Sequence, residues 1–108
     1  MRLSLSLLLL LSLFSASALA EVKEYTLTLR NHRFVPAQLT IPANTKVKLL
    51  VVNEDATPEE FESHELNREK IVTGKGKINV YIGPLKPGRY PFFGEFHMDT
   101  AQGALIAK

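Results

Sequence analysis

Apolar and polar residues alternate along several short segments of this chain. In Val22–Arg30, for example, Tyr25, Leu27 and Leu29 occupy alternate positions, with threonine and charged residues between them. A period of two is the pattern of a β-strand with one face buried and the other face in water. Alternation in four segments predicts a core that contains Tyr25, Leu27, Val47, Leu49, Val51, Ile78, Val80, Tyr90 and Phe92.

Turn-forming residues separate these segments, and no stretch after residue 20 shows a helical period of useful length. Asn, Gly and Pro predict turns within residues 31–36, 42–45, 73–76 and 83–88. About seven or eight short strands with turn signals of this kind are typical of a β-sandwich or barrel. We therefore expect an all-β fold over residues 21–108, a Greek-key sandwich or barrel of antiparallel strands.

The first twenty residues have a different character from the rest of the chain. Arg2 precedes a leucine-rich run, and Ala18-Leu19-Ala20 offers the small residues of a cleavage site. This is the organisation of a secretory signal peptide, and the apolar run is short for a membrane span. We expect residues 1–20 to be removed and residues 21–108 to form one domain in the periplasm, not inserted in the membrane.

Charges in the expected mature chain are nearly balanced but unevenly placed. Without Arg2, 12 basic residues remain against 11 acidic residues, and no basic stripe indicates a nucleic acid partner. Most of the acidic residues lie in one stretch: Glu54, Asp55, Glu59, Glu60, Glu62, Glu65 and Glu69. The sequence has no cysteine, which excludes disulfides and thiolate ligands.

The acidic stretch carries the first group of candidate metal ligands. Glu60, Glu62 and His64 are two positions apart, so they share one face of the short strand expected at residues 60–64. Neighbouring carboxylates repel one another unless a cation neutralises them. Carboxylate and imidazole ligands suit iron, manganese, zinc and Cu(II). On composition alone, the same stretch also fits a solvated loop.

The second group lies in the loop between the last two predicted strands. Gly94 ends one strand and Gly103 allows the chain to enter the next, with Glu95 and His97 between them. A histidine flanked by acidic residues at the end of two core strands is a candidate for metal chemistry. The alternative is a loop histidine that forms hydrogen bonds with the backbone.

Motifs spread over most of residues 21–108 resemble those of cupredoxins. They are Phe34-x-Pro36, Asn53-x-Asp55, Pro87-Gly88-x-Tyr90-x-Phe92, and Gly94-x-x-His97 followed by Gly103. The resemblance implies a cupredoxin-like Greek-key fold. In blue-copper members, the last loop carries a cysteine, a histidine and a methionine that hold the metal. Here Gly94 stands at the cysteine position, the upstream histidine position falls at about Glu59 or Glu60, and only His97 matches directly. The missing cysteine excludes ordinary blue-copper electron transfer.

A narrower resemblance concerns Glu60-Phe61-Glu62-Ser63, Glu69-Lys70 and the loop from Phe93 to Gly103. These segments are similar to cupredoxin-like periplasmic proteins associated with iron-permease uptake systems. The resemblance implies that a copper or iron ion is bound, and that iron is bound, oxidised or delivered to a permease. The ligand set that it implies is Glu60, Glu62, His97, Glu69, Glu95 and His64.

Two other interpretations fit the same residues. The first is a copper-binding protein that handles copper without redox chemistry. The second is a metal-free β-sandwich whose acidic loop docks a partner protein. Metal content after purification distinguishes the two.

Overall fold

The structure is a computed structural model and describes residues 21–108. The expected signal peptide, residues 1–20, lies outside the described residues. Nine strands and one short 3₁₀ helix follow one another: β1 (Lys23–Arg30), β2 (Arg33–Val35), β3 (Gln38–Ile41), β4 (Val47–Asn53), β5 (Glu59–Ser63), β6 (Arg68–Val72), β7 (Lys77–Ile82), β8 (Gly88–Gly94), η2 (Glu95–His97) and β9 (Gln102–Ala107). Within residues 21–108, no helix is long and apolar enough to cross a membrane.

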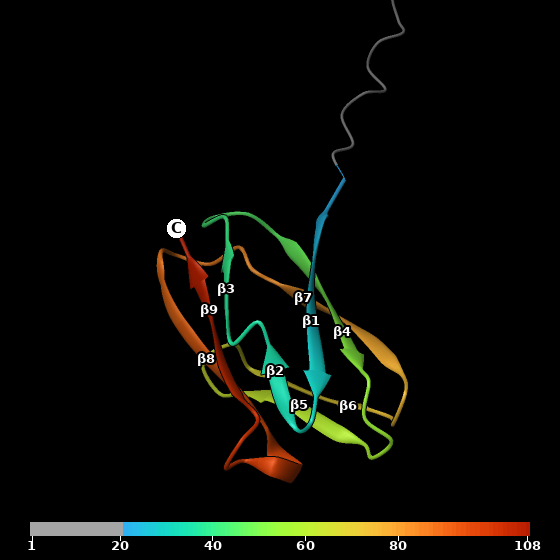
Figure 1. The fold of residues 1–108 in the computed structure, drawn as a ribbon. Helices are drawn as coiled ribbons and strands as arrows, with labels where there is room; N and C mark the ends of the chain where they lie inside the picture. Colours follow the sequence, from blue (N-terminus) through green and yellow to red (C-terminus); the bar gives the residue numbers. More distant parts are fainter. Residues whose placement is uncertain (1–20) are drawn as a thin grey trace, which may run out of the picture.

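The strands form two sheets that face each other (Figure 1). One sheet has the order β2-β1-β4-β7, and the other has the order β3-β9-β8-β5-β6. The prediction of an all-β sandwich is therefore confirmed. Two details differ from the expectation. The pairs β1–β4 and β3–β9 are parallel, because alternation determines which face of a strand is buried but not the direction of its neighbour. The additional strand, β2, has only three residues, too few for its alternation to stand out from the turn predicted there.

Inward-facing side chains of both sheets form one core, largely as predicted. Leu27, Val47, Leu49, Val51, Val80 and Phe92 are buried, and Tyr25, Ile78 and Tyr90 are partly buried against them. Three aromatic rings pack at the centre. The ring centroid of Phe92 lies 4.9 Å from that of Phe34, in an edge-to-face arrangement, and 5.2 Å from that of Phe61. Burial of each such ring contributes about 1.5–3 kcal/mol to stability.

Two connections in this core position the acidic stretch and the last loop. β5 pairs with β8 so that Phe61 lies opposite Gly94, the last residue before η2. β5 also pairs with β6, which puts Glu62 opposite Glu69. As Figure 1 shows, η2 lies at the end of the sandwich away from the C-terminus, beside β5 and β2. The sheet register therefore brings the acidic stretch and the last loop together.

Candidate metal centre

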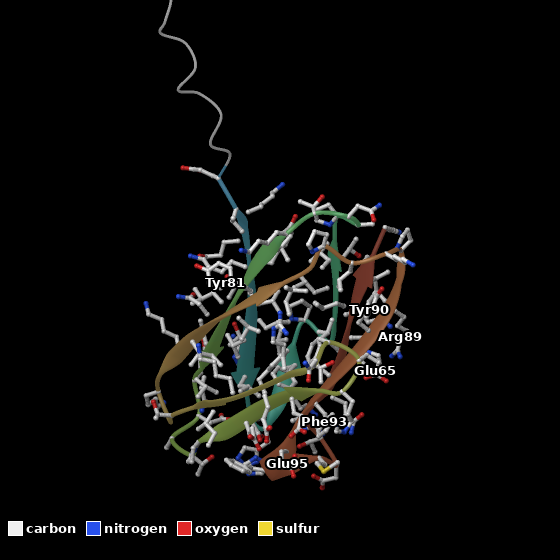
Figure 2. The ribbon with its side chains drawn as sticks, turned by 180° about the vertical axis from the view of Figure 1, so that it is seen from behind. Glu65, Tyr81, Arg89, Tyr90, Phe93 and Glu95 are labelled. Atoms are coloured by element: carbon white, nitrogen blue, oxygen red, sulfur yellow. The ribbon has the colours of Figure 1, made fainter. Side chains whose placement is uncertain are left out.

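Glu60, Glu62 and Glu95 form a carboxylate cluster at the surface. β5 turns Glu59, Phe61 and Ser63 inward, so Glu60 and Glu62 project from the outer face of the five-stranded sheet. Glu95 follows Gly94 at the end of β8 (Figure 2). One carboxylate oxygen from each of the three glutamates lies within 4.8 Å of the others.

Glu62 is a largely buried member of this cluster, with 15% of its side chain accessible. When the three carboxylates are ionised, its Oε1 atom is buried and has no donor among residues 21–108. A hydrogen bond with the Glu95 carboxyl group, then burial and the charges of the neighbouring glutamates, raise the pKa of Glu62 to about 7. The position therefore calls for a positive charge, either a proton or a metal ion.

Glu69 adds a fourth carboxylate beside the cluster. It lies on β6, directly across from Glu62, and its side chain is exposed. The pKa of Glu60 is raised above its ordinary value, first by burial and then by a hydrogen bond with Glu69. Like-charged side chains directly opposite each other destabilise a sheet. The cluster is therefore a point of electrostatic strain on the surface.

His64 lies at the margin of the cluster. Its Nδ1 atom is 4.0 Å from Oε2 of Glu62, its side chain is 76% exposed, and its ring contacts that of Phe93. Glu62, His64 and Glu69 also line an open hollow of about 480 Å³. Of the residues predicted as ligands, the structure thus brings Glu60, Glu62 and Glu95 together and places Glu69 and His64 beside them.

His97 faces a different partner, the buried carboxylate of Glu59. Its Nδ1 atom is 2.7 Å from Oε1 of Glu59, and only 3% of the Glu59 side chain is exposed. The other oxygen of Glu59 accepts hydrogen bonds from the backbone N–H groups of Phe96 and Glu60. Glu59 is not among the ligands predicted from the sequence. The alternation of β5 could have identified it, because residue 59 shares the inner face of that strand with Phe61.

His32 stacks on the face of the His97 ring. The two imidazole rings are stacked, with centroids 3.6 Å apart and planes 12° from parallel. Asn31 and His32 both have positive φ angles, and their N–H groups donate to the two carboxylate oxygens of Asp55. The hydrogen bond from His32 N–H lowers the pKa of Asp55. The sequence predicts a turn at residues 31–36, and only the turn geometry shows that His32 reaches His97.

The residues around His97 do not fit a blue-copper centre. A Cβ atom added at Gly94 would lie 2.6 Å from Cδ of Glu59 and 2.7 Å from Cβ of Ala101, so no side chain fits there. The sequence supplies no thiolate, the ligand on which such a centre depends. Met98, the remaining soft candidate in the loop, is 50% exposed. A carboxylate therefore fills the space that a ligand on residue 94 would need.

Comparison with known proteins identifies the fold as cupredoxin-like. A family model described as a cupredoxin-like domain matches residues 3–107. An uncharacterized protein of Rickettsia prowazekii (strain Madrid E) is 51% identical over 85 residues, which are 79% of this chain and 68% of that protein. Among solved structures, auracyanin A, a "blue" copper protein of Chloroflexus aurantiacus, has a TM-score of 0.68 at 12% identity and covers 82% of this chain and 100% of its own. Amicyanin of Paracoccus versutus has a TM-score of 0.63 at 16% identity and covers 86% of this chain and 87% of its own. At such low identity, these two structures show the fold alone.

Proposed function

Because the chain belongs to the family of cupredoxin-like domains, we propose that it is a metal-binding protein that holds copper or iron at its surface glutamates. The observation that carries this proposal is the buried Oε1 atom of Glu62, which faces two other carboxylates and has no donor among the described residues. A bound cation would supply the positive charge that this oxygen needs. Glu60, Glu62 and Glu95 would be the ligands, with Glu69 and His64 within reach.

The chemistry of these donors limits the metal. Carboxylate oxygens suit hard and borderline cations such as Fe(II), Fe(III), Mn(II) and Cu(II), whereas Cu(I) and a blue-copper centre need sulfur ligands. Carboxyl groups must lose their protons to bind a metal ion, so metal and proton compete for the cluster. A metal bound here would be exchangeable, because the cluster opens directly to solvent.

We further propose that the protein assists iron uptake in the periplasm. The support is the resemblance of Glu60-Phe61-Glu62-Ser63 and the Phe93–Gly103 loop to proteins associated with iron permeases, together with the expected signal peptide. The partner would be a permease or another periplasmic uptake component, which receives iron from the exposed cluster. Delivery fits an open carboxylate site better than oxidation does. An Fe(II)-oxidising activity would appear as Fe(II) consumption above the air background.

Copper handling is the second candidate. The structures that share this fold include a blue copper protein and a purple cupredoxin from Nitrosopumilus maritimus. A protein that handles copper would bind Cu(II) at the same carboxylates but would serve copper balance instead of iron supply.

Metal titration tests the binding step. Purified residues 21–108 are titrated calorimetrically with Cu(II), anaerobic Fe(II) and Zn(II), alongside Glu62→Gln and the control Glu65→Gln. Glu65 is exposed and lies outside the cluster. We expect the wild type and the control to bind one of these metals with equal affinity and Glu62→Gln to bind it more weakly. A wild-type protein that binds none of the three metals would contradict the proposal and favour the metal-free alternative.

Gene deletion tests the uptake step. Deletion cells are grown under iron limitation with Fe(II) as the sole source, and radiolabelled iron is counted. We expect the deletion cells to grow more slowly and to accumulate less iron. The wild-type gene should restore both, and the gene for Glu62→Gln should restore neither. If iron accumulation is normal and the cells are sensitive to copper stress, copper handling becomes the better proposal and iron uptake is excluded.

A further inference from the structure

We propose that Glu59 is a positioning residue for the metal centre: its buried carboxylate anchors η2 and thereby holds Glu95 over Glu60 and Glu62. The inference rests on the proposed function, since it concerns how the same carboxylate cluster is assembled. It also assigns a role to the buried Glu59–His97 pair, which lies where blue-copper relatives would place a metal but lacks the cysteine that such a centre uses.

The hydrogen bonds of Glu59 connect the two segments that supply the cluster. Its Oε2 atom accepts from Glu60 N–H on β5, at 3.0 Å, and from Phe96 N–H in η2, at 2.7 Å. Glu60 is itself a proposed ligand, and Phe96 directly follows the ligand Glu95. One carboxylate oxygen therefore joins the backbone beside both ligands, although residues 60 and 95 are far apart in the sequence.

The remaining contacts hold the carboxylate and the loop in place. Oε1 of Glu59 pairs with Nδ1 of His97 at 2.7 Å, and the His97 ring stacks on His32. The His32 backbone is fixed in turn by Asp55. A carboxylate that is 97% buried is costly unless donors surround it, and here three donors do. Such a fully bonded arrangement is rigid, which is what an anchor requires.

Gly94 is the second part of the same arrangement. The Cβ atom of any other residue would lie 2.6 Å from the Glu59 carboxyl carbon, so the carboxylate keeps its place only beside glycine. Because that space is filled and the Glu59 carboxylate already has three hydrogen-bond partners, whereas Oε1 of Glu62 has none among the described residues, we place the metal on the sheet surface outside the buried pair. Outer partners of this kind typically change metal affinity by about 10–100-fold when removed.

Two substitutions of Glu59 separate anchoring from direct metal binding. Glu59→Ala removes all three hydrogen bonds and is expected to weaken Cu(II) or Fe(II) binding by about tenfold or more. Glu59→Gln keeps an oxygen for the two backbone N–H groups, and its amide can donate to Nδ1 of the other His97 tautomer. It should therefore recover most of the affinity. If Glu59 were instead a ligand, Glu59→Gln would bind as poorly as Glu59→Ala, and the proposal would be wrong.

A core substitution controls for lost stability. Ile41 is buried in β3 and pairs with Ala107, at the end of β9 away from the loop, so Ile41→Ala should lower the unfolding temperature but leave the metal affinity unchanged. Should Ile41→Ala weaken binding as much as Glu59→Ala, the effect of Glu59 is one of general stability only, and positioning is excluded.

Amide hydrogen exchange in the metal-free protein tests the anchor without relying on metal binding. The Phe96 N–H should be protected in the wild type and in Glu59→Gln, and should exchange faster in Glu59→Ala. Equal protection in all three proteins overturns the anchoring role. A wild type with a protected Phe96 N–H that binds no metal overturns the proposed function and, with it, the positioning role, while leaving the anchor itself established.

Discussion

Glu59 and Glu62 lie three residues apart on the same strand, and their carboxyl groups have opposite environments. Glu59 faces inward, is 3% exposed and is surrounded by donors: two backbone N–H groups and His97. Glu62 faces outward, is 15% exposed and is surrounded by acceptors: Glu60, Glu69 and Glu95. The more deeply buried carboxylate is thus the satisfied one, and the more accessible carboxylate has one oxygen, Oε1, without a hydrogen-bond partner among residues 21–108.

This comparison shows that burial alone does not identify a binding site. A buried charge is tolerated when hydrogen bonds replace its hydration. A cluster of like charges at a surface is unfavourable at any depth, and a ligand of opposite charge relieves it. The metal is therefore expected beside Glu62, where one carboxylate oxygen has no donor among residues 21–108 and the nearest imidazole, that of His64, is 4.0 Å from the other oxygen. It is not expected beside Glu59, where the protein provides three donors.

The largest expected effect is on metal affinity. Glu60→Gln, Glu62→Gln and Glu95→Gln each keep the shape of the side chain but lose a charged ligand. Each should weaken metal binding by more than about 100-fold, the largest loss that is typical of residues that only hydrogen-bond to a metal ligand. Calorimetric titration measures the affinities, with Glu65→Gln and Lys75→Ala as controls that should match the wild type. Unchanged affinity in all three ligand variants would show that the metal binds elsewhere.

Gly94→Ala should have the next largest effect, because it forces the Glu59 carboxylate from its position. Its Cβ atom would overlap Glu59 and Ala101, and overpacking of this kind costs up to about 3 kcal/mol of unfolding free energy. Gly88→Ala, on the same strand, is a matched control: its Cβ atom would lie no closer than 3.5 Å to Tyr90. Urea unfolding measures both variants. Equal stability of the two would mean that the space beside Glu59 is not tightly filled.

Truncation of the two compared glutamates should change stability in opposite directions. Glu59→Ala leaves buried N–H groups unpaired and should lower the unfolding free energy by about 2 kcal/mol. Glu62→Ala removes a repelled carboxylate and should raise the unfolding temperature of the metal-free protein at pH 8. Thermal and urea unfolding in the presence of a chelator provide the measurement. A loss of stability in both variants would contradict the contrast drawn between their environments.

The smallest expected effect is a pH dependence that belongs to Glu62. Its pKa is about 7 in the folded protein against an ordinary value of 4.5, so between these two values the folded state binds more protons than the unfolded state. The stability of the metal-free protein should therefore fall as the pH rises from about 4.5 to about 7. Glu62→Gln should flatten this part of the profile of unfolding temperature against pH. A decline of the same size in the variant would assign the dependence to other groups.

The sequence predicted the fold well because alternation is strong in the strands that build the core. Val47, Leu49 and Val51 alternate without interruption and are all fully buried. Pairing direction could not be predicted, since a strand with a buried face satisfies the pattern beside either a parallel or an antiparallel neighbour. The three-residue strand β2 is held by pairing with β1, a contact that its own residues do not encode.

The candidate site was predicted only in part. The two-residue spacing of Glu60 and Glu62 identified their shared face, and the loop position of Glu95 allowed it to join them. Glu59 was missed as a site residue, because a glutamate at the start of an acidic stretch looks solvated until its three donors are seen. These donors come from residues 60, 96 and 97, and only the register of β5 against β8 brings the last two within reach.

Crystals grown with the bound metal, with diffraction data collected at its absorption edge, test the central claim most directly. The anomalous signal locates the ion without assumptions about its ligands. A peak among the carboxylates of Glu60, Glu62 and Glu95, with the Glu59–His97 hydrogen bond intact, is the predicted result. A peak between Glu59 and His97, with the surface carboxylates empty, would contradict it.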